Sequence, residues 1–173
     1  PLRGEPAPTL LALLDTCATN MGSRLLHHWL HHPLRNRTTL RGRLDAVDSL
    51  ISRARSVHEE LKPSVDVERI SARIALKSAR PRDLSGLRDT LTRLPQLHAT
   101  LPPRPLRERA GERVETSNLL QTLSDALQAD SSLVELLQKT LKTEPSSVLR
   151  DGGVIADGFD AELDELRGIQ TNC

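Results

Sequence analysis

The sequence predicts an all-α fold, a multi-helix bundle, and three observations point to it. Leucine-rich stripes recur at helical spacing along most of the chain. Aromatic residues are only 1% of the 173 residues, so the core must be built from Leu, Ile, Val and Ala. No segment alternates apolar and polar residues for long, and at most a minor short strand pair near residues 148–156 is expected. Such a chain is typical of helices packed on helices.

The first predicted helices precede Pro33. Residues 9–14 carry four leucines and predict one or two apolar turns. A helix is expected over 21–32, with Asn20 as its N-cap, and Pro33 cannot continue it. Its apolar residues recur at i, i+4 and i+8, and they are Met21, Leu25 and Trp29.

A long helix is expected next, from a cap at Thr38 or Thr39 to a stop at Pro63. Ser64 is then expected to cap a helix that closes near Ala79. One apolar stripe runs along the long helix, formed by Leu40, Leu44, Val47, Ile51, Ala54 and Leu61.

The second half of the chain continues the helical pattern around one interruption. Residues 83–94 repeat the leucine stripe and predict a helix. Residues 95–117 are expected to form a loop-rich insertion, because prolines and arginines cluster there. Leucines resume helical spacing over 119–127, and Ser131 or Ser132 is expected to cap the next helix.

The segment 150–159 is expected to form a glycine turn that leads into a last helix. Gly152, Gly153 and Gly158 suit a tight reversal, because glycine adopts positive φ at little cost. Asp160 belongs to this turn, and the carboxylates after it favour the first turn of a helix through the helix dipole.

Composition excludes several classes of protein. The 24 basic and 23 acidic side chains give a net charge of +1, with no overall bias towards nucleic acid or anionic lipid. Two cysteines do not make a disulfide framework, and Cys17 is expected to be a small buried hydrophobe. No apolar run approaches the length of a membrane span, so no membrane partner and a cytoplasmic location are expected.

The sequence offers little catalytic chemistry. Two histidine pairs, His27 with His31 and His28 with His32, have the i, i+4 spacing of a metal site on a helix. A polar helix face is the preferred interpretation, because no third ligand lies near in sequence. No lysine follows Lys142, which excludes a P-loop at the glycines. No catalytic residue, cofactor or metal is therefore expected, and the chain alone is not predicted to be an enzyme.

Arginine clusters leave two interpretations open. Arginines within 35–43 could contact DNA phosphates, but no aromatic residues alternate with them for base stacking, so DNA-binding residues are left unassigned. The arginine-rich segment from Asp66 to Asp83 could be a solvated face or could pin neighbouring helices together, since arginine suits bidentate pairing.

Three runs together resemble one family, the MutS DNA mismatch-repair proteins. They span 9–34, 66–84 and 150–167, in the family's order and at about its spacing. The first contains Met21-Gly22-Ser23-Arg24-Leu25-Leu26, the second Ala79-Arg80-Pro81-Arg82-Asp83-Leu84, and the third Arg150-Asp151-Gly152-Gly153-Val154-Ile155-Ala156. The resemblance implies that 1–173 is a single fragment of the helical core, or lever, domain of a bacterial MutS, and that 150–159 leads into the lever helix.

The resemblance also implies a role and partners. The role is a structural, allosteric one that links the ATPase and DNA-clamp regions of the parent, with the connector, clamp and ATPase domains as neighbours. The parent is expected to be a DNA-dependent ATPase that uses ATP and Mg, binds mismatched DNA and MutL, and forms a homodimer. The alternative is a stand-alone helical module that binds protein or DNA. The residues expected to pack between helices or domains are Met21, Gly22, Arg24, Trp29, Asp66, Glu68, Arg69, Arg73, Arg80, Arg82 and Asp83.

Self-association is a further expectation. In the family, helices that return from the clamp complete the core, and this chain lacks them. Apolar stripes would then stay uncovered, and large exposed apolar patches tend to find partners.

Overall fold

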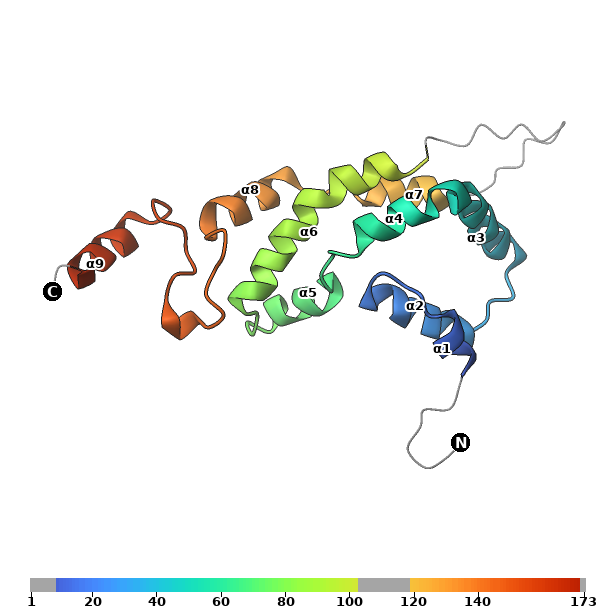
Figure 1. The fold of residues 1–173 in the computed structure, drawn as a ribbon, viewed down its shortest axis with the longest axis horizontal. Coiled ribbons are helices and arrows are strands. Elements are labelled where there is room, and N and C mark those ends of the chain that lie inside the picture. Colours follow the sequence, from blue (N-terminus) through green and yellow to red (C-terminus); the bar gives the residue numbers. More distant parts are fainter. Residues whose placement is uncertain (1–8, 103–118, 172–173) are drawn as a thin grey trace, which may run out of the picture. The chain divides into compact units, whose positions relative to one another are not determined.

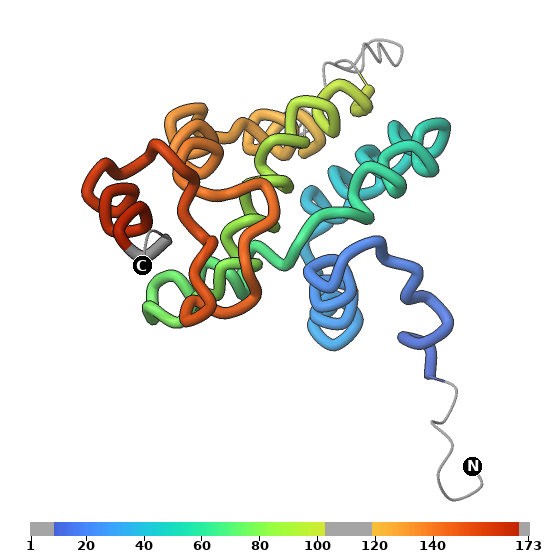
Figure 2. The backbone as a smooth tube through the Cα atoms, turned by 60° about the vertical axis from the view of Figure 1, so that its left-hand side comes forward, coloured from blue at the N-terminus to red at the C-terminus, as the bar shows by residue number. Residues whose placement is uncertain are grey.

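The predicted all-α class is confirmed. The computed structural model describes residues 9–102 and 119–171, and Figures 1 and 2 show helices, with a longer irregular connection between the last two α-helices. Within the described ranges, pairing between extended segments is limited to one isolated antiparallel bridge between Leu141 and Ile155. No helix among the described residues is both long and apolar enough to cross a bilayer.

The chain divides into two compact units, each described here by itself. The first comprises Pro1–Asp66 and Pro95–Gln128, and the second comprises Val67–Leu94 and Ala129–Cys173. Helix α6 (Pro81–Thr100) contributes to both units.

The first unit begins with the predicted short helix, α1 (Leu10–Leu14), and continues with α2 (Asn20–His31) and α3 (Arg37–Leu50). Its caps differ slightly from those predicted. Thr19, not Asn20, caps α2, because its Oγ1 accepts a hydrogen bond from Gly22 N–H at 3.1 Å. Asn36 caps α3, since its Oδ1 accepts from Thr39 N–H at 3.1 Å; Thr38 and Thr39 lie inside the first turn.

The long helix predicted up to Pro63 is wrong as a single element. After α3 the chain forms a 3₁₀ helix, η1 (Ile51–Arg53), and then α4 (Ala54–Leu61). The Arg53 guanidinium donates to the carbonyl of Thr100 at 3.1 Å, which ties the break to the end of α6. α7 (Leu119–Ala126) completes the unit and packs against α3.

The apolar stripe of α3 faces solvent. Leu44 is 67% exposed and Ile51, at the start of η1, is 68% exposed, whereas Gly42 is buried. Ala46 and Ser49, which follow Gly42 at helical spacing, are half-buried. Small residues therefore form the packed side of α3, because they let the neighbouring backbone approach closely.

Cys17 is exposed, so the expectation of a buried thiol is wrong. The residue still packs closely on one side, because a Cβ placed on Gly22 would lie 3.3 Å from the Cys17 Cβ. The bare backbone of Gly22 thus accommodates the loop between α1 and α2. A side chain at position 22 would press on the Cys17 Cβ, which would have to shift by a few tenths of an ångström.

The second unit contains α5 (Val67–Ala75), the part of α6 before Pro95, and α8 (Ser131–Thr140). α5 starts directly after Asp66, so Ser64 is not its cap, and it ends before Ala79, since Lys77 has a φ of 53°. Asp130 caps α8 in place of Ser131 or Ser132, because its Oδ1 accepts from Ser132 N–H at 2.9 Å.

α6 continues through Pro95, where the loop-rich insertion was expected to begin. A proline inside a helix removes one backbone hydrogen bond, but the next turn is held because Leu97 is buried. Residues 95–100 are therefore helical, and the rest of the predicted insertion, from 103 onwards, lies outside the described residues.

After α8 the chain forms the bridge, a 3₁₀ helix η2 (Leu149–Asp151), the glycine turn and α9 (Ala161–Thr171). The short strand pair predicted within 148–156 is instead a single bridge whose other partner, Leu141, follows α8 directly. Lys142 N–H donates to the Val154 carbonyl at 3.0 Å, and Ala156 N–H donates to the Thr140 carbonyl at 2.8 Å. The buried apolar side chains of this unit are Ile70, Leu87, Leu141 and Val154.

Candidate functional site

Polar joints, in which an arginine side chain connects different segments of the chain, are the main feature of both units. In the first unit, Arg24 on α2 pairs with Asp66, the residue before α5. Two parallel bonds join them, Nη1 to Oδ2 at 2.6 Å and Nη2 to Oδ1 at 2.9 Å. The Asp66 side chain is only 14% exposed. Bidentate, desolvated pairs of this kind fix geometry more strongly than surface ion pairs do.

A second joint in the same unit connects α2 with α3. The Arg43 guanidinium carbon lies 3.8 Å from the centre of the Trp29 ring. A cation over the face of an indole is attracted by the negative face of the ring. Trp29 thus contacts α3 through a cation.

In the second unit, Asp83 fixes the turn between α5 and α6. Its Oδ1 accepts from Arg73 Nη1 at 2.7 Å, and its Oδ2 accepts from Arg80 N–H at 3.0 Å. The hydrogen bond from the Arg80 amide is the main cause that lowers the pKa of the Asp83 carboxyl. The hydrogen bond and the positive charge of Arg73 lower this pKa further. The hydrogen bond from the Arg80 amide to the Asp83 side chain, three residues later, is half of a capping box. Pro81 suits the first position of the helix.

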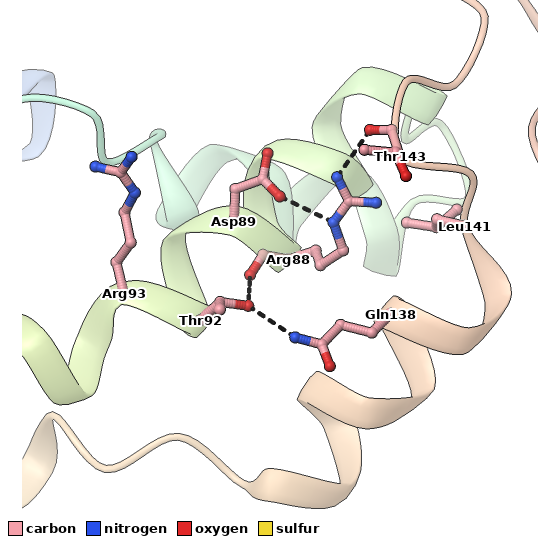
Figure 3. Close-up of a pocket in the computed structure, with 7 residues that line it drawn as sticks. All are labelled: Arg88, Asp89, Thr92, Arg93, Gln138, Leu141 and Thr143. Atoms are coloured by element: carbon pink, nitrogen blue, oxygen red, sulfur yellow. Dashed lines mark hydrogen bonds and ion pairs between the residues drawn. The ribbon is translucent and has the colours of Figure 1, made fainter.

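The most buried joint centres on Arg88 of α6, which is 9% exposed. Its guanidinium donates to the carbonyls of Lys142 at 2.9 Å and Thr143 at 3.0 Å, and to Asp89 Oδ1 at 2.8 Å. Figure 3 shows this side chain crossing from α6 to the segment that follows α8. One arginine therefore satisfies two consecutive backbone acceptors that no helix or strand would pair.

An open pocket lies beside Arg88, lined also by Thr92, Arg93 and Gln138. Thr92 Oγ1 donates to the Arg88 carbonyl at 2.8 Å and accepts from Gln138 Nε2 at 3.3 Å. These bonds connect α6 with α8. The polar groups of the pocket thus serve the joint, and they do not form an acid–base pair or a nucleophile with its base.

The last joint fixes the start of α9. Arg167 Nη1 contacts Asp157 Oδ1 at 2.9 Å and Asp164 Oδ1 at 3.1 Å, and Nη2 donates to the Ile155 carbonyl at 3.0 Å. Asp164 also accepts from Gly158 N–H at 2.6 Å. One arginine therefore joins the bridge, the glycine turn and the helix.

The glycines of the predicted turn adopt left-handed backbone conformations. Gly152, Gly153 and Gly158 have φ values of 69°, 68° and 84°. Asp160 Oδ1 accepts from Leu163 N–H at 3.0 Å, as a residue at a helix start does.

Two glycines near α9 give a matched test of this turn. A Cβ at Gly158 or at Gly168 would meet no atom within 4 Å, so only backbone conformation separates the two. Gly158→Ala should destabilise the protein by about 1–2 kcal/mol, because φ is positive there. Gly168→Ala, inside α9, should stabilise it by about 0.5–1 kcal/mol. Urea denaturation measures both, and a stabilising Gly158→Ala would contradict the turn.

The predicted packing residues divide into two groups. The first group takes part in the contacts described above and consists of Arg24, Asp66, Arg73, Asp83, Trp29 and Gly22. Arg80 belongs to it through its backbone amide. Glu68 and Arg69 each interact within the chain. Met21 is half-buried, and Arg82 is exposed.

Sequence reasoning missed Arg88 and Arg167. The partners of Arg88 are mainly backbone carbonyls, which leave no signal in a sequence. Arg167 did carry a signal, because Asp164 precedes it at i, i+3.

The histidine pairs of α2 lie side by side. The ring centroids are 4.2 Å apart for His27 and His31 and 4.5 Å apart for His28 and His32. Within the described part of the chain, no three His, Cys, Asp or Glu side chains are grouped to hold a metal ion.

One comparison with known proteins identifies the chain. A family model described as MutS domain III matches residues 2–171. This match covers almost all of the 173 residues, including all three runs that carry the resemblance. The chain therefore belongs to the MutS domain III family, the core domain of MutS-type mismatch-repair proteins.

Proposed function

We propose that this domain is a structural core that transmits conformational change between the ATPase and DNA-clamp regions of a MutS-type protein. In this proposal ATP, Mg, mismatched DNA and MutL bind to other parts of a longer, cytoplasmic, homodimeric parent. The chain itself contributes no catalytic group. It supplies the packed helices through which a movement at one end reaches the other.

The Arg167 joint is the observation that carries the proposal. Its contacts reach the Ile155 carbonyl, the Asp157 carboxylate and, within α9, Asp164. A rotation of α9 would break these bonds unless the bridge and the glycine turn moved with the helix. The start of α9 thus behaves as part of one rigid body with the bridge, which is what transmission of movement requires.

The Arg88 joint supports the same role from within the same unit. It ties α6 to the two residues that follow the bridge residue Leu141. Together the two joints connect α6, the bridge and α9 by polar contacts of fixed geometry. Such contacts have discrete arrangements, unlike an apolar surface, along which helices can slide.

The test is an Arg167→Ala substitution in a complete MutS-type protein that carries this domain. We expect DNA binding without nucleotide, and ATP hydrolysis without DNA, to stay within about two-fold of the unsubstituted protein. The change in ATP hydrolysis on adding DNA, and the release of DNA on adding ATP, should weaken by about five-fold or more, in the range of typical allosteric coupling.

Arg150→Ala is the matched control. Arg150 is a neighbouring arginine whose side chain is 88% exposed and whose carboxylate contact, to Asp151, is 3.8 Å long. Arg150→Ala should leave DNA binding, ATP hydrolysis and the coupling between them unchanged. Unaltered coupling in Arg167→Ala, or a direct loss of ATP hydrolysis or DNA binding, would contradict a transmitting role.

The alternative, a stand-alone helical module that binds protein or DNA, makes a different demand. It requires the isolated chain to bind its partner tightly. A titration of the chain with duplex DNA at several salt concentrations separates the two, because phosphate contacts give an affinity that falls steeply with salt. Tight, salt-dependent binding would favour the alternative.

A further inference from the structure

The outward face of α3 is apolar, although α3 also packs against α7. Leu44, Val47 and Ile51 are 67%, 60% and 68% exposed. Single exposed apolar residues are normal on a protein surface, but a continuous stripe marks a contact site. Leu40 extends this stripe by one more turn. We call Leu40, Leu44, Val47 and Ile51 the α3 stripe.

The spacing of the α3 stripe is that of a helix–helix seam. Steps of four and three residues place Leu40, Leu44 and Val47 within a sector of about 60° on α3, and Ile51, the first residue of η1, follows four residues later. The same steps define the a and d positions of a heptad repeat, through which two helices pack side by side. Gly42, Ala46 and Ser49 lie on the opposite side, which is the side used within the chain.

The charges beside the α3 stripe match those of a second, antiparallel copy. Arg41 follows Leu40 and Asp48 follows Val47, so both lie on the same flank of the stripe. If Leu44 lies against Val47 of a second copy, Arg41 lies against Asp48 of that copy. The two-fold axis repeats this pair, as in any self-complementary interface.

We propose that the α3 stripe is a self-association surface, through which two copies of this chain pair antiparallel with two Arg41–Asp48 ion pairs across the axis. Asp48 has a contact within its own chain, and its two oxygens can accept from a further donor. Arg43, on the other flank, already lies over Trp29. The inference stands independently of the proposed transmitting role.

Four side chains from each copy make a small interface. We therefore expect a dissociation constant on the order of 10 µM, because small interfaces offset little of the entropy lost on association. Sedimentation equilibrium of the chain across that concentration range should show a monomer–dimer equilibrium. A monomer at every concentration would overturn the proposal.

A matched pair of substitutions locates the surface. Leu44→Asp should weaken the dimer by about ten-fold or more, since it places a charge at the centre of the seam. Leu149→Asp is the control, because Leu149 is equally exposed, at 68%, but lies in the second unit. Circular dichroism verifies that both variants are folded. A dimer that survives Leu44→Asp, or that Leu149→Asp also breaks, would overturn the assignment to α3.

Charge exchange tests the antiparallel register. Arg41→Glu alone and Asp48→Arg alone should each weaken self-association several-fold, because each places like charges opposite one another. An equimolar mixture of the two variants should form a heterodimer of about the original affinity, since both cross-axis pairs are then of opposite sign. Failure of the mixture to associate would overturn the register, as would rescue of Asp48→Arg by Arg43→Glu instead.

Discussion

Replacement of Arg88 by alanine should cost about 2–4 kcal/mol of unfolding free energy. The substitution removes three hydrogen bonds from a side chain in a buried position and leaves the carbonyls of Lys142 and Thr143 without their donor. Lys142 is half-buried, so water replaces the donor of its carbonyl only in part, although Thr143 is exposed; the loss of the buried arginine side chain adds to the cost. Urea denaturation followed by circular dichroism measures the change.

Arg93→Ala is the control for this prediction. Arg93 lines the same pocket on the same helix but is exposed, so its replacement should change stability by less than about 0.5 kcal/mol. Amide hydrogen exchange adds a local measurement. The amides of Lys142 and Ala156, which hold the bridge, should lose protection in Arg88→Ala. Equal effects of the two substitutions would show that Arg88 does not hold the segment after α8.

Arg24→Ala should be the second most damaging single change, at about 2–3 kcal/mol. It removes both bonds of the bidentate pair and leaves the largely buried Asp66 carboxylate without its guanidinium. Breaking one side of a desolvated ion pair is costly, because the remaining charge cannot regain its hydration. Arg24 itself is 37% exposed, which places the expected cost below that of a fully buried pair.

Arg24→Lys separates charge from geometry. Lysine keeps the positive charge but cannot form two parallel bonds, so we expect it to recover less than half of the lost stability. Full recovery would mean that charge alone matters at this joint. The double variant Arg24→Ala with Asp66→Asn should be more stable than Arg24→Ala, because it removes the charge of a carboxylate that is only 14% exposed.

The helices themselves could be predicted from the sequence, but their first residues could not. Thr19 and Asn20 are both good capping residues, as are Asp130, Ser131 and Ser132. Composition does not reveal which of them adopts the extended backbone that a cap needs. The structure selects Thr19 and Asp130, in each case the earlier residue.

The packed face of α3 could not be predicted from the sequence, for a different reason. Periodicity shows that a helix is amphipathic, and it favours the large apolar residues as the buried face. In α3, Gly42 and Ala46 follow the same period on the other side, and they are buried and half-buried. Sequence alone therefore predicted the stripe but not its direction.

The joints were predictable in kind but not in their pairing. The excess of arginine over lysine favours bidentate contacts, and the resemblance singled out Arg24, Asp66, Arg73 and Asp83 as packing residues. Asp66 lies i, i+3 from Arg69, but its bidentate partner is Arg24, 42 residues away. Such a pair depends on the path of the chain, which local spacing does not determine.

The Trp29–Arg43 contact has a consequence for spectroscopy. The chain has one tryptophan and no tyrosine, so its intrinsic fluorescence arises from a single indole. That indole lies under a guanidinium at the contact between α2 and α3. The tryptophan fluorescence of the native protein therefore reports on the Trp29–Arg43 contact without an added label.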